Sequence, residues 1–169
     1  FAKYGDMIST ENIKPLEINN GYAKRYDGIA NLNTSSENGE ATICIFSALK
    51  RSFPMKIDMM EKHPLGSQAF IPMKESIFLA LVAPQGDKPE IDKIESFIIP
   101  KGMGINYKPG IWHFPLISLE NMRLEGPTLE NINSNIIYFF IFHYFVIKVM
   151  FFMCKRLIFL TKFQKKILL

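Results

Sequence analysis

The chain contains little cysteine, histidine or tryptophan: two, three and one residues among 169. Cys44 and Cys154 lie far apart in segments of different composition, which indicates neither a disulfide framework nor a zinc site. Scarce cysteine favours a reducing compartment, so we expect a cytoplasmic protein. Phosphate-binding loops, dinucleotide fingerprints and nucleic-acid motifs are also absent from the sequence. We therefore expect no nucleotide cofactor and no nucleic-acid partner.

Acidic residues are missing from one end of the chain. Residues 134–169 carry six Lys or Arg side chains and no Asp or Glu, whereas residues 1–133 carry 14 basic and 16 acidic side chains. The formal net charge of +4 therefore comes from this C-terminal tail, and the body before it is mildly acidic. We expect two parts, a domain over residues 1–133 and a tail over residues 134–169 that does not pack onto it. The body is long enough for one domain with a sizeable core.

The tail contains an apolar stretch, residues 136–154, which is interrupted only by His143 and Lys148. A membrane-spanning helix needs roughly 20 such residues, and the basic residues that follow would place the C-terminus on the cytoplasmic side. The abundance of Phe, Ile, Lys, Leu, Asn and Tyr is also typical of translated AT-rich non-coding DNA. A read-through product is favoured over a genuine tail anchor, and membrane association is expected only if the stretch is genuine.

The body has no sustained helical periodicity and consists of short apolar runs between turn-forming residues. Residues 41–47 and 77–83 predict strands, the second ended by a strong turn at residues 84–87. Residues 96–99 predict a third strand. Many short strands of this kind indicate an all-β fold, either an antiparallel β-barrel or a jelly roll.

One short helix is predicted over residues 88–95. Pro89 suits a first helical turn, and Ile91, Ile94 and Phe97 follow at helical spacing. The expected fold is therefore an all-β body with one short helix.

Two segments each place a histidine beside a proline and a glycine-bearing turn: residues 63–72 (HPLGSQAFIP) and 104–116 (GINYKPGIWHFPL). With residues 1–8 (FAKYGDMI) and 18–26 (INNGYAKRY), they resemble the ureidoglycolate lyase family, called ureidoglycolate hydrolase in older usage. The resemblance covers about residues 1–120, in the family's order. It implies a cupin-like β-barrel, a homodimer, and an enzyme of allantoin breakdown that cleaves (S)-ureidoglycolate to glyoxylate and urea.

The two ends of the chain depart from the family pattern. The chain begins at Phe1, inside the family's first block and without an initiator methionine, so we expect an N-terminally clipped sequence. Near the other end, the family has a strand of the form Asp-Phe-x-Val-x-Asp-Arg before a Gly-Pro turn. Here Met122 runs directly into Arg123, and the turn follows at Gly126-Pro127. The last family strand is therefore expected to be missing between residues 122 and 123.

The resemblance also implies candidate metal ligands. Metal-binding cupins carry His-x-His with a Glu soon after, and later a His that follows Gly-x-x. At the corresponding positions this chain has Glu61, His63, Gln68 and His113. Alternate strand residues point the same way, so Glu61 and His63 are expected to face the barrel interior together. A divalent metal ion, nickel by family resemblance, would be held loosely because Gln68 is a weak ligand.

The implied reaction assigns a role to each candidate. Elimination needs a base for the substrate hydroxyl, an acid for the departing urea nitrogen, and a cation for the carboxylate. The catalytic candidates are His113 as the base, His63 with Glu61 as the acid or as metal ligands, and Tyr107 as a reserve proton donor. The substrate-binding candidates are Ser67 and Gln68 for the urea amide, Lys50 or Arg51 for the carboxylate, and Trp112 for the pocket wall.

Simpler interpretations of the same residues stay open. Ser67 and Gln68 also suit backbone hydrogen bonding at a barrel turn, and Trp112 also suits a core position. The replaced metal ligands are compatible with a non-catalytic, cupin-like binding or regulatory protein. A membrane-anchored protein with a cupin head is a further alternative, which depends only on whether the tail is genuine. Retention of both histidine segments favours the enzyme, because a binding protein requires neither histidine.

Overall fold

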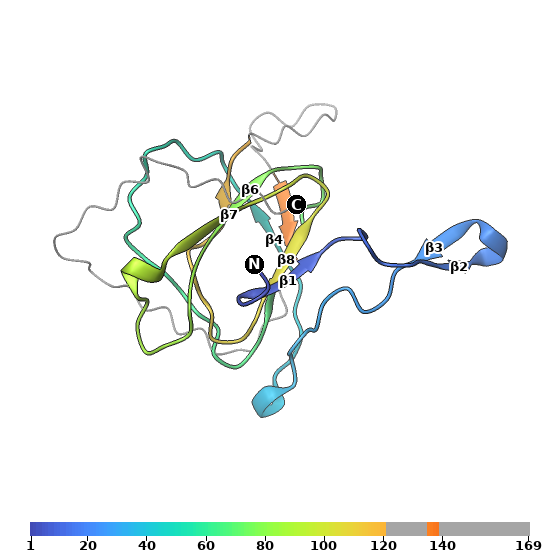
Figure 1. Ribbon diagram of the computed structural model, residues 1–169, viewed down its shortest axis with the longest axis horizontal. Coiled ribbons are helices and arrows are strands. Elements are labelled where there is room, and N and C mark those ends of the chain that lie inside the picture. Colours follow the sequence, from blue (N-terminus) through green and yellow to red (C-terminus); the bar gives the residue numbers. More distant parts are fainter. Residues whose placement is uncertain (121–134, 139–169) are drawn as a thin grey trace.

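The computed structural model describes residues 1–120 and 135–138, and in them the chain forms short antiparallel strands (Figure 1). The predicted loss of a strand between residues 122 and 123 lies outside the described residues, as does most of the apolar stretch 136–154. In chain order the strands are β1 (Gly5–Ile8), β2 (Leu16–Ile18), β3 (Ala23–Arg25), β4 (Cys44–Ser47), β5 (Gln68–Phe70), β6 (Phe78–Ala83), β7 (Glu95–Ile99), β8 (Gly104–Tyr107), β9 (Trp112–His113), β10 (Ile117–Ser118) and β11 (Asn135–Tyr138).

The strands form four antiparallel sheets. One has the order β1-β8-β5, and a second has the order β10-β6-β7 with β9 also paired to β6. The other two are the pairs β11-β4 and β2-β3. The only helical elements in the described residues are three 3₁₀ turns, η1 (Asn19–Gly21), η2 (Ser36–Asn38) and η3 (Ile91–Lys93). The expected all-β, cupin-like antiparallel fold is confirmed.

Strand β6 lies at the centre of the core because both of its faces are covered. Phe78, Ala80 and Val82 point into one apolar cluster, whereas Leu79 and Leu81 point into another. Every residue of β6 is buried. Burial on both faces explains why residues 77–83 form an unbroken apolar run instead of the alternating pattern of a one-sided strand.

The helix predicted over residues 88–95 is wrong. Only η3 (Ile91–Lys93) is helical, as a single 3₁₀ turn, and the chain is extended from Glu95 onward as β7. Pairing of β7 with β6 favours the extended structure, because it places Phe97 opposite Ala80 and within the core. The apolar residues at helical spacing therefore belong to a turn and a strand, and tertiary pairing overrides the local pattern.

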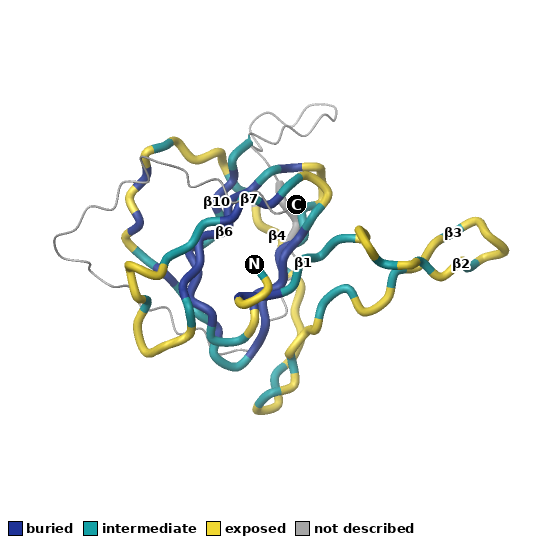
Figure 2. The backbone as a smooth tube through the Cα atoms, viewed as in Figure 1, coloured by how far each residue is buried: buried dark blue, intermediate teal, exposed yellow. Residues whose placement is uncertain are grey.

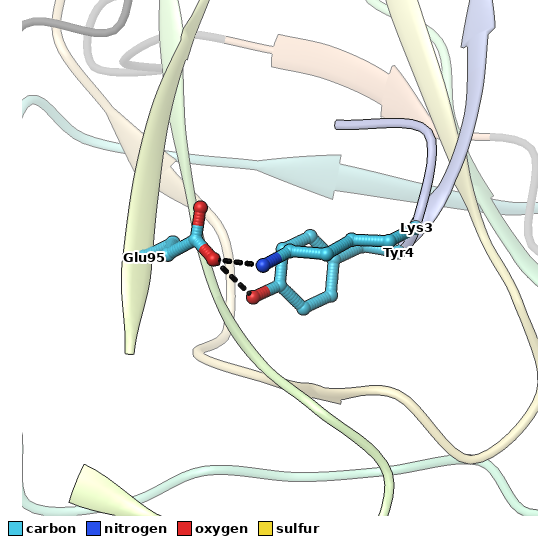
Figure 3. Close-up of polar contacts among 3 residues, drawn as sticks. All are labelled: Lys3, Tyr4 and Glu95. Atoms are coloured by element: carbon cyan, nitrogen blue, oxygen red, sulfur yellow. Dashed lines mark hydrogen bonds and ion pairs between the residues drawn. The ribbon is translucent and has the colours of Figure 1, made fainter. Parts of the chain in front are cut away.

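The N-terminal residues close the core at the end of β7. The Phe1 ring packs edge-on against Phe97, and the buried Tyr4 ring also lies against Phe97. The side chains of Lys3 and Tyr4 both point to the Glu95 carboxylate (Figure 3), where the Tyr4 hydroxyl donates at 2.8 Å and the Lys3 ammonium also donates. Burial, followed by the hydrogen bond to Glu95, raises the pKa of the Tyr4 phenol above its ordinary value. Tyr4 therefore remains a hydrogen-bond donor at neutral pH.

The β2–β3 hairpin extends away from the rest of the described chain (Figure 1). Its residues are exposed or half-buried along its length (Figure 2), and the Tyr22 side chain at its tip is 93% exposed. The turn that joins the two strands uses left-handed backbone at Asn19, Asn20 and Gly21. Asn and Gly adopt this conformation at low cost, which explains the Asn-Asn-Gly sequence.

Four residues of the tail lie on the body. Strand β11 pairs antiparallel with β4, with Ile136 opposite Phe46 and Ile137 opposite Ile45. An added strand satisfies backbone groups that the edge of β4 would otherwise leave to solvent. We expected the tail not to pack onto the body, but these four residues do pair with it. The division of the chain at residue 133 stays a prediction. Among the described residues, no helix is long and apolar enough to cross a membrane.

Candidate active site

The chain just before the first histidine segment meets the second segment at an isolated β-bridge between Glu61 and His113. The backbone nitrogen of each donates to the carbonyl oxygen of the other, at 2.8 Å and 2.9 Å. His113 also pairs with Val82 through β9 and β6, which ties the bridge to the central strand of the core. The backbone of His63 is held separately, because its carbonyl accepts the Gly110 N–H at 2.8 Å.

The side chains of Glu61, His63 and His113 form one cluster. One ligand atom from each lies within 4.8 Å of the others, and His113 Nε2 is 3.5 Å from Glu61 Oε1. The two imidazole rings stack with their centroids 5.4 Å apart and an interplanar angle of 26°. The structure thus brings together three candidates from segments about fifty residues apart.

The hydrogen bonding of His113 selects one tautomer of its neutral ring. Nδ1 lies 2.9 Å from the Ile111 carbonyl oxygen, which only accepts, so Nδ1 carries the proton. The Nε2 lone pair is then directed to the cluster, where that atom is buried and has no hydrogen-bond partner within the described part of the chain. A buried imidazole lone pair held in this way is suited to accept a proton or to bind a metal ion.

His63 is neutral in the folded protein. Burial, followed by the charge of the neighbouring His113, lowers the pKa of its imidazole to about 4, although the Glu61 carboxylate opposes both. A neutral imidazole at pH 7 is a metal ligand or a hydrogen-bonding group rather than a proton donor. Of the two roles predicted for His63, this pKa favours metal ligand over general acid.

Tyr107 lies against His113, and Gln68 is the partner of Tyr107 on the neighbouring strand. The Tyr107 ring stacks on the His113 ring at 4.5 Å and 15°. Complete burial, followed by the charge of Glu61, raises the pKa of the Tyr107 phenol far above its ordinary value, so this group releases its proton poorly. Gln68 pairs with Tyr107 across β5 and β8, which places both side chains on one face of the sheet. Gln68 Oε1 is buried, with no hydrogen-bond partner in residues 1–120 or 135–138.

An open cleft of about 570 Å³ adjoins the cluster through Glu61. It brings Lys50 and Arg51 to the same cavity as this carboxylate, and both basic side chains are exposed. The Arg51 backbone nitrogen donates to the Ser118 carbonyl at 3.0 Å, which holds this segment against β10. The remaining lining is apolar: Phe46, Ala48, Leu49, Phe70, Pro115 and Leu116.

The apolar lining residues were not identified from the sequence. They occur close to Lys50 and Arg51, to Gln68 or to His113, in runs that look like ordinary strand or core residues. Their only signal is this closeness in sequence to the polar candidates.

Three of the predicted substrate-binding residues, Ser67, Gln68 and Trp112, do not line the cleft. Ser67 is buried, and its hydroxyl accepts the Asn33 N–H at 2.8 Å and contacts the Asn33 carbonyl at 3.3 Å. Trp112 precedes His113 on β9 and so points to the opposite side, where it packs with Met60 and Ala83. The geometry of Ser67 and Trp112 matches their alternative interpretations as a backbone-binding group and a core residue.

The cluster fits a divalent transition metal ion. Two imidazoles and one carboxylate are ligands that Ni²⁺ or Zn²⁺ accept, and three protein ligands leave positions for substrate. The buried His113 Nε2 is a suitable donor atom. The three-residue group does not include Gln68, so its predicted role as fourth ligand stays a prediction.

An all-β, cupin-like fold in which a half-buried carboxylate and two buried histidines adjoin a cleft with two basic side chains is typical of a cupin-type enzyme. Residues 1–128 match the model of one protein family, which is described as Ureidoglycolate lyase. A "Ureidoglycolate lyase" of Pseudomonas paraeruginosa is 44% identical over 120 residues, 71% of either chain. Those of Azotobacter vinelandii (40% identical, 70% of this chain and 72% of the relative) and Burkholderia mallei (39%, 70% and 69%) match over 119 residues. The chain belongs to the ureidoglycolate lyase family, as the histidine segments predicted.

Proposed function

We propose that this chain is a carbon–nitrogen lyase that cleaves (S)-ureidoglycolate into glyoxylate and urea. The observation that carries the proposal is the cluster of Glu61, His63 and His113, whose carboxylate opens onto the cleft that also contains Lys50 and Arg51. Family membership and relatives named for this activity support it. They also disfavour the alternative of a non-catalytic binding protein.

The substrate determines what the site must supply. One carbon of ureidoglycolate carries a carboxylate, a hydroxyl and the ureido nitrogen. In the elimination, a base takes the hydroxyl proton and the oxygen electron pair forms the carbonyl of glyoxylate. The carbon–nitrogen bond breaks, and the nitrogen takes up a proton as urea leaves. No proton is gained or lost overall, so one group can accept the proton and then return it.

His113 is the group best suited to this transfer. Its Nδ1–H is held by the Ile111 carbonyl, and its Nε2 lone pair faces the cluster at 3.5 Å from Glu61. The carboxylate stabilises the imidazolium that forms when Nε2 takes the hydroxyl proton. The same nitrogen then donates this proton to the leaving nitrogen. This route needs no separate acid, a role for which neutral His63 and the weakly acidic Tyr107 are poorly suited.

Lys50 and Arg51 would bind the substrate carboxylate at the cleft. Arg pairs with a carboxylate through two parallel hydrogen bonds, and such charge-assisted bonds are among the stronger polar contacts. Gln68, whose buried amide oxygen has no hydrogen-bond partner within the described residues, is available to accept from the urea NH₂ group.

A divalent metal ion, nickel by family resemblance, would be held by Glu61, His63 and His113. Such an ion acts as a Lewis acid that polarises a bound oxygen. Binding of the ion through His113 Nε2 and use of this atom as the base exclude one another, because both use the same lone pair. Dependence of the activity on a metal ion therefore decides between the two uses of His113.

The test is product release by the purified chain, before and after treatment with a chelator and then with Ni²⁺, Mn²⁺ or Zn²⁺ added back. The expected result is urea and glyoxylate in equal amounts. Activity that survives chelation supports His113 as the base, and activity restored only by an ion supports the metal site. Release of ammonia in place of urea would contradict the lyase.

The homodimer that the resemblance implies is part of the proposal. Light scattering coupled to size-exclusion chromatography would give twice the 19.5 kDa chain mass if it forms.

A further inference from the structure

The turn that follows β6, residues 84–87, contacts the residues that directly precede His63 and His113, on the side away from the cluster. The Gly86 carbonyl accepts two hydrogen bonds, one from the Lys62 ammonium at 2.7 Å and one from the Trp112 indole N–H at 3.0 Å. The Lys62 ammonium also lies 4.7 Å from the centre of the Trp112 ring, in a cation–π contact. One carbonyl oxygen thus joins Lys62 and Trp112, and the two side chains also contact each other.

Each of these residues is the immediate neighbour of a residue of the cluster. Lys62 stands between Glu61 and His63, and Trp112 precedes His113. Since consecutive residues of extended chain point to opposite sides, contacts of Lys62 and Trp112 fix the orientation of their neighbours. The same turn makes a further hydrogen bond to the second histidine segment, in which Gln85 Nε2 donates to the Pro109 carbonyl at 2.6 Å.

The backbone pairing at the cluster is short, although β9 ties His113 to β6. Glu61 and His113 are joined by one isolated bridge, and β9 is only two residues long. Catalytic groups must be held within about half an ångström of their working geometry, and a misplacement of about 1 Å can cost roughly 100-fold in rate. Contacts from the opposite side add to these backbone restraints and help to fix the orientation of the imidazoles.

We infer that Lys62, bound to the Gly86 carbonyl and stacked on Trp112, is a positioning residue that holds His63 and His113 in register for the reaction. The inference rests on the proposed function for its kinetic consequence, although the geometric consequence can be measured without activity. Lys62 is half-buried on the side of the segment opposite the cluster and does not line the cleft. It acts through its neighbours.

The test compares Lys62→Met, which keeps the aliphatic stem but removes the charge and the donor, with Lys62→Arg, which keeps both. The control is Lys24→Met, the same change at an exposed position on the projecting hairpin. Activity is measured well below the melting temperature of each variant, so that only folded protein is compared. We expect kcat of Lys62→Met to fall about tenfold with KM changed less than about twofold. Lys62→Arg should recover most of kcat, and Lys24→Met should match the wild type.

The second readout is the set of imidazole NMR signals, which does not depend on activity. The chain has three histidines, and single His→Gln variants assign their signals. The His113 ring stacks at 4.5 Å on Tyr107 and at 5.4 Å on His63, so small displacements change its ring-current shifts. We expect the His63 and His113 signals to move in Lys62→Met and to return in Lys62→Arg. Gln85→Ala, at an exposed side chain, should move them in the same sense.

Two results would overturn the inference: unchanged imidazole signals in Lys62→Met, or a Lys62→Arg variant as impaired as Lys62→Met. Loss of melting temperature without any change in kcat would reduce Lys62 to a structural residue. If the wild type releases no urea, the proposed function fails, and the NMR comparison still decides whether Lys62 positions the histidines.

Discussion

Acidification should destabilise this protein through His63, and a His63→Gln variant should lose that part of the effect. Burial lowers the pKa of the His63 imidazole from 6.5 to about 4 in the folded chain. Between these two values the unfolded chain binds a proton at His63 that the folded chain does not bind. Protonation therefore favours the unfolded state. The free energy of unfolding should fall as the pH drops from about 6.5 to about 4, and this contribution should be constant above and below that range.

The expected magnitude follows from the two pKa values. One unit of difference is worth about 1.36 kcal/mol, so the shift gives roughly 2–3 kcal/mol of lost stability between pH 7.5 and 4.5. Gln carries no titratable group and keeps the polarity and approximate size of the side chain. For each protein we take the change in unfolding free energy between the two pH values, and we then subtract the value of the variant from that of the wild type. The contributions of the other titrating groups largely cancel in this difference.

Urea denaturation with a chelator present provides the assay. The chain has one tryptophan, the fully buried Trp112, so its fluorescence reports the loss of the core beside the site. The same pH dependence in the wild type and in His63→Gln would refute the reasoning, since His63 would then have an ordinary pKa. Wild-type stability that increases on acidification, relative to the variant, would show that attraction to Glu61 outweighs burial.

Three further substitutions test the fold and the cleft. Ser67→Ala removes the hydroxyl bonded to the Asn33 backbone and should lower the unfolding free energy by about 1–2 kcal/mol with kcat unchanged, as measured by urea denaturation and steady-state kinetics. Gly5→Ala would place its Cβ 2.0 Å from the Asn106 carbonyl oxygen; we expect a loss of about 3 kcal/mol or more in the same unfolding assay, and a wild-type melt would contradict the β1–β8 register. Arg51→Gln should raise KM for ureidoglycolate about tenfold with little change in kcat, and an unaltered KM would remove Arg51 from carboxylate binding.

The strands that could be predicted are those whose pattern depends least on their neighbours. Residues 77–83 are apolar throughout and form β6, which is covered on both faces. The helix prediction at 88–95 failed because the pairing of β7 with β6, a contact between different parts of the chain, determines its structure. The Asn-Asn-Gly turn of the β2–β3 hairpin is a local signal that sequence reasoning overlooked.

The same distinction between local and long-range signals applies to the candidate site. The two motif segments predicted that Glu61, His63 and His113 come from cupin-like positions, and the structure brings them together. The direction in which the Ser67 and Trp112 side chains point depends on the strand register and on distant partners such as Asn33. Spacing within a motif specifies neither of these. The pKa of His63 depends on burial by the whole fold, and for this reason its neutral state could not be derived from the sequence.

The most direct test of the central claim is the rate of urea release from ureidoglycolate by His113→Ala and by His63→Ala. The rate of His113→Ala should fall by roughly 10²- to 10⁴-fold, the usual effect of removing a positioned acid or base. The rate of His63→Ala should fall as well, because this change removes a proposed metal ligand that stacks on His113. Both variants should keep a cooperative melt. Ser76→Ala provides a matched control, because it truncates a fully buried polar side chain that does not line the cleft. Near-normal release by both folded histidine variants would contradict the account and leave these residues a structural role only.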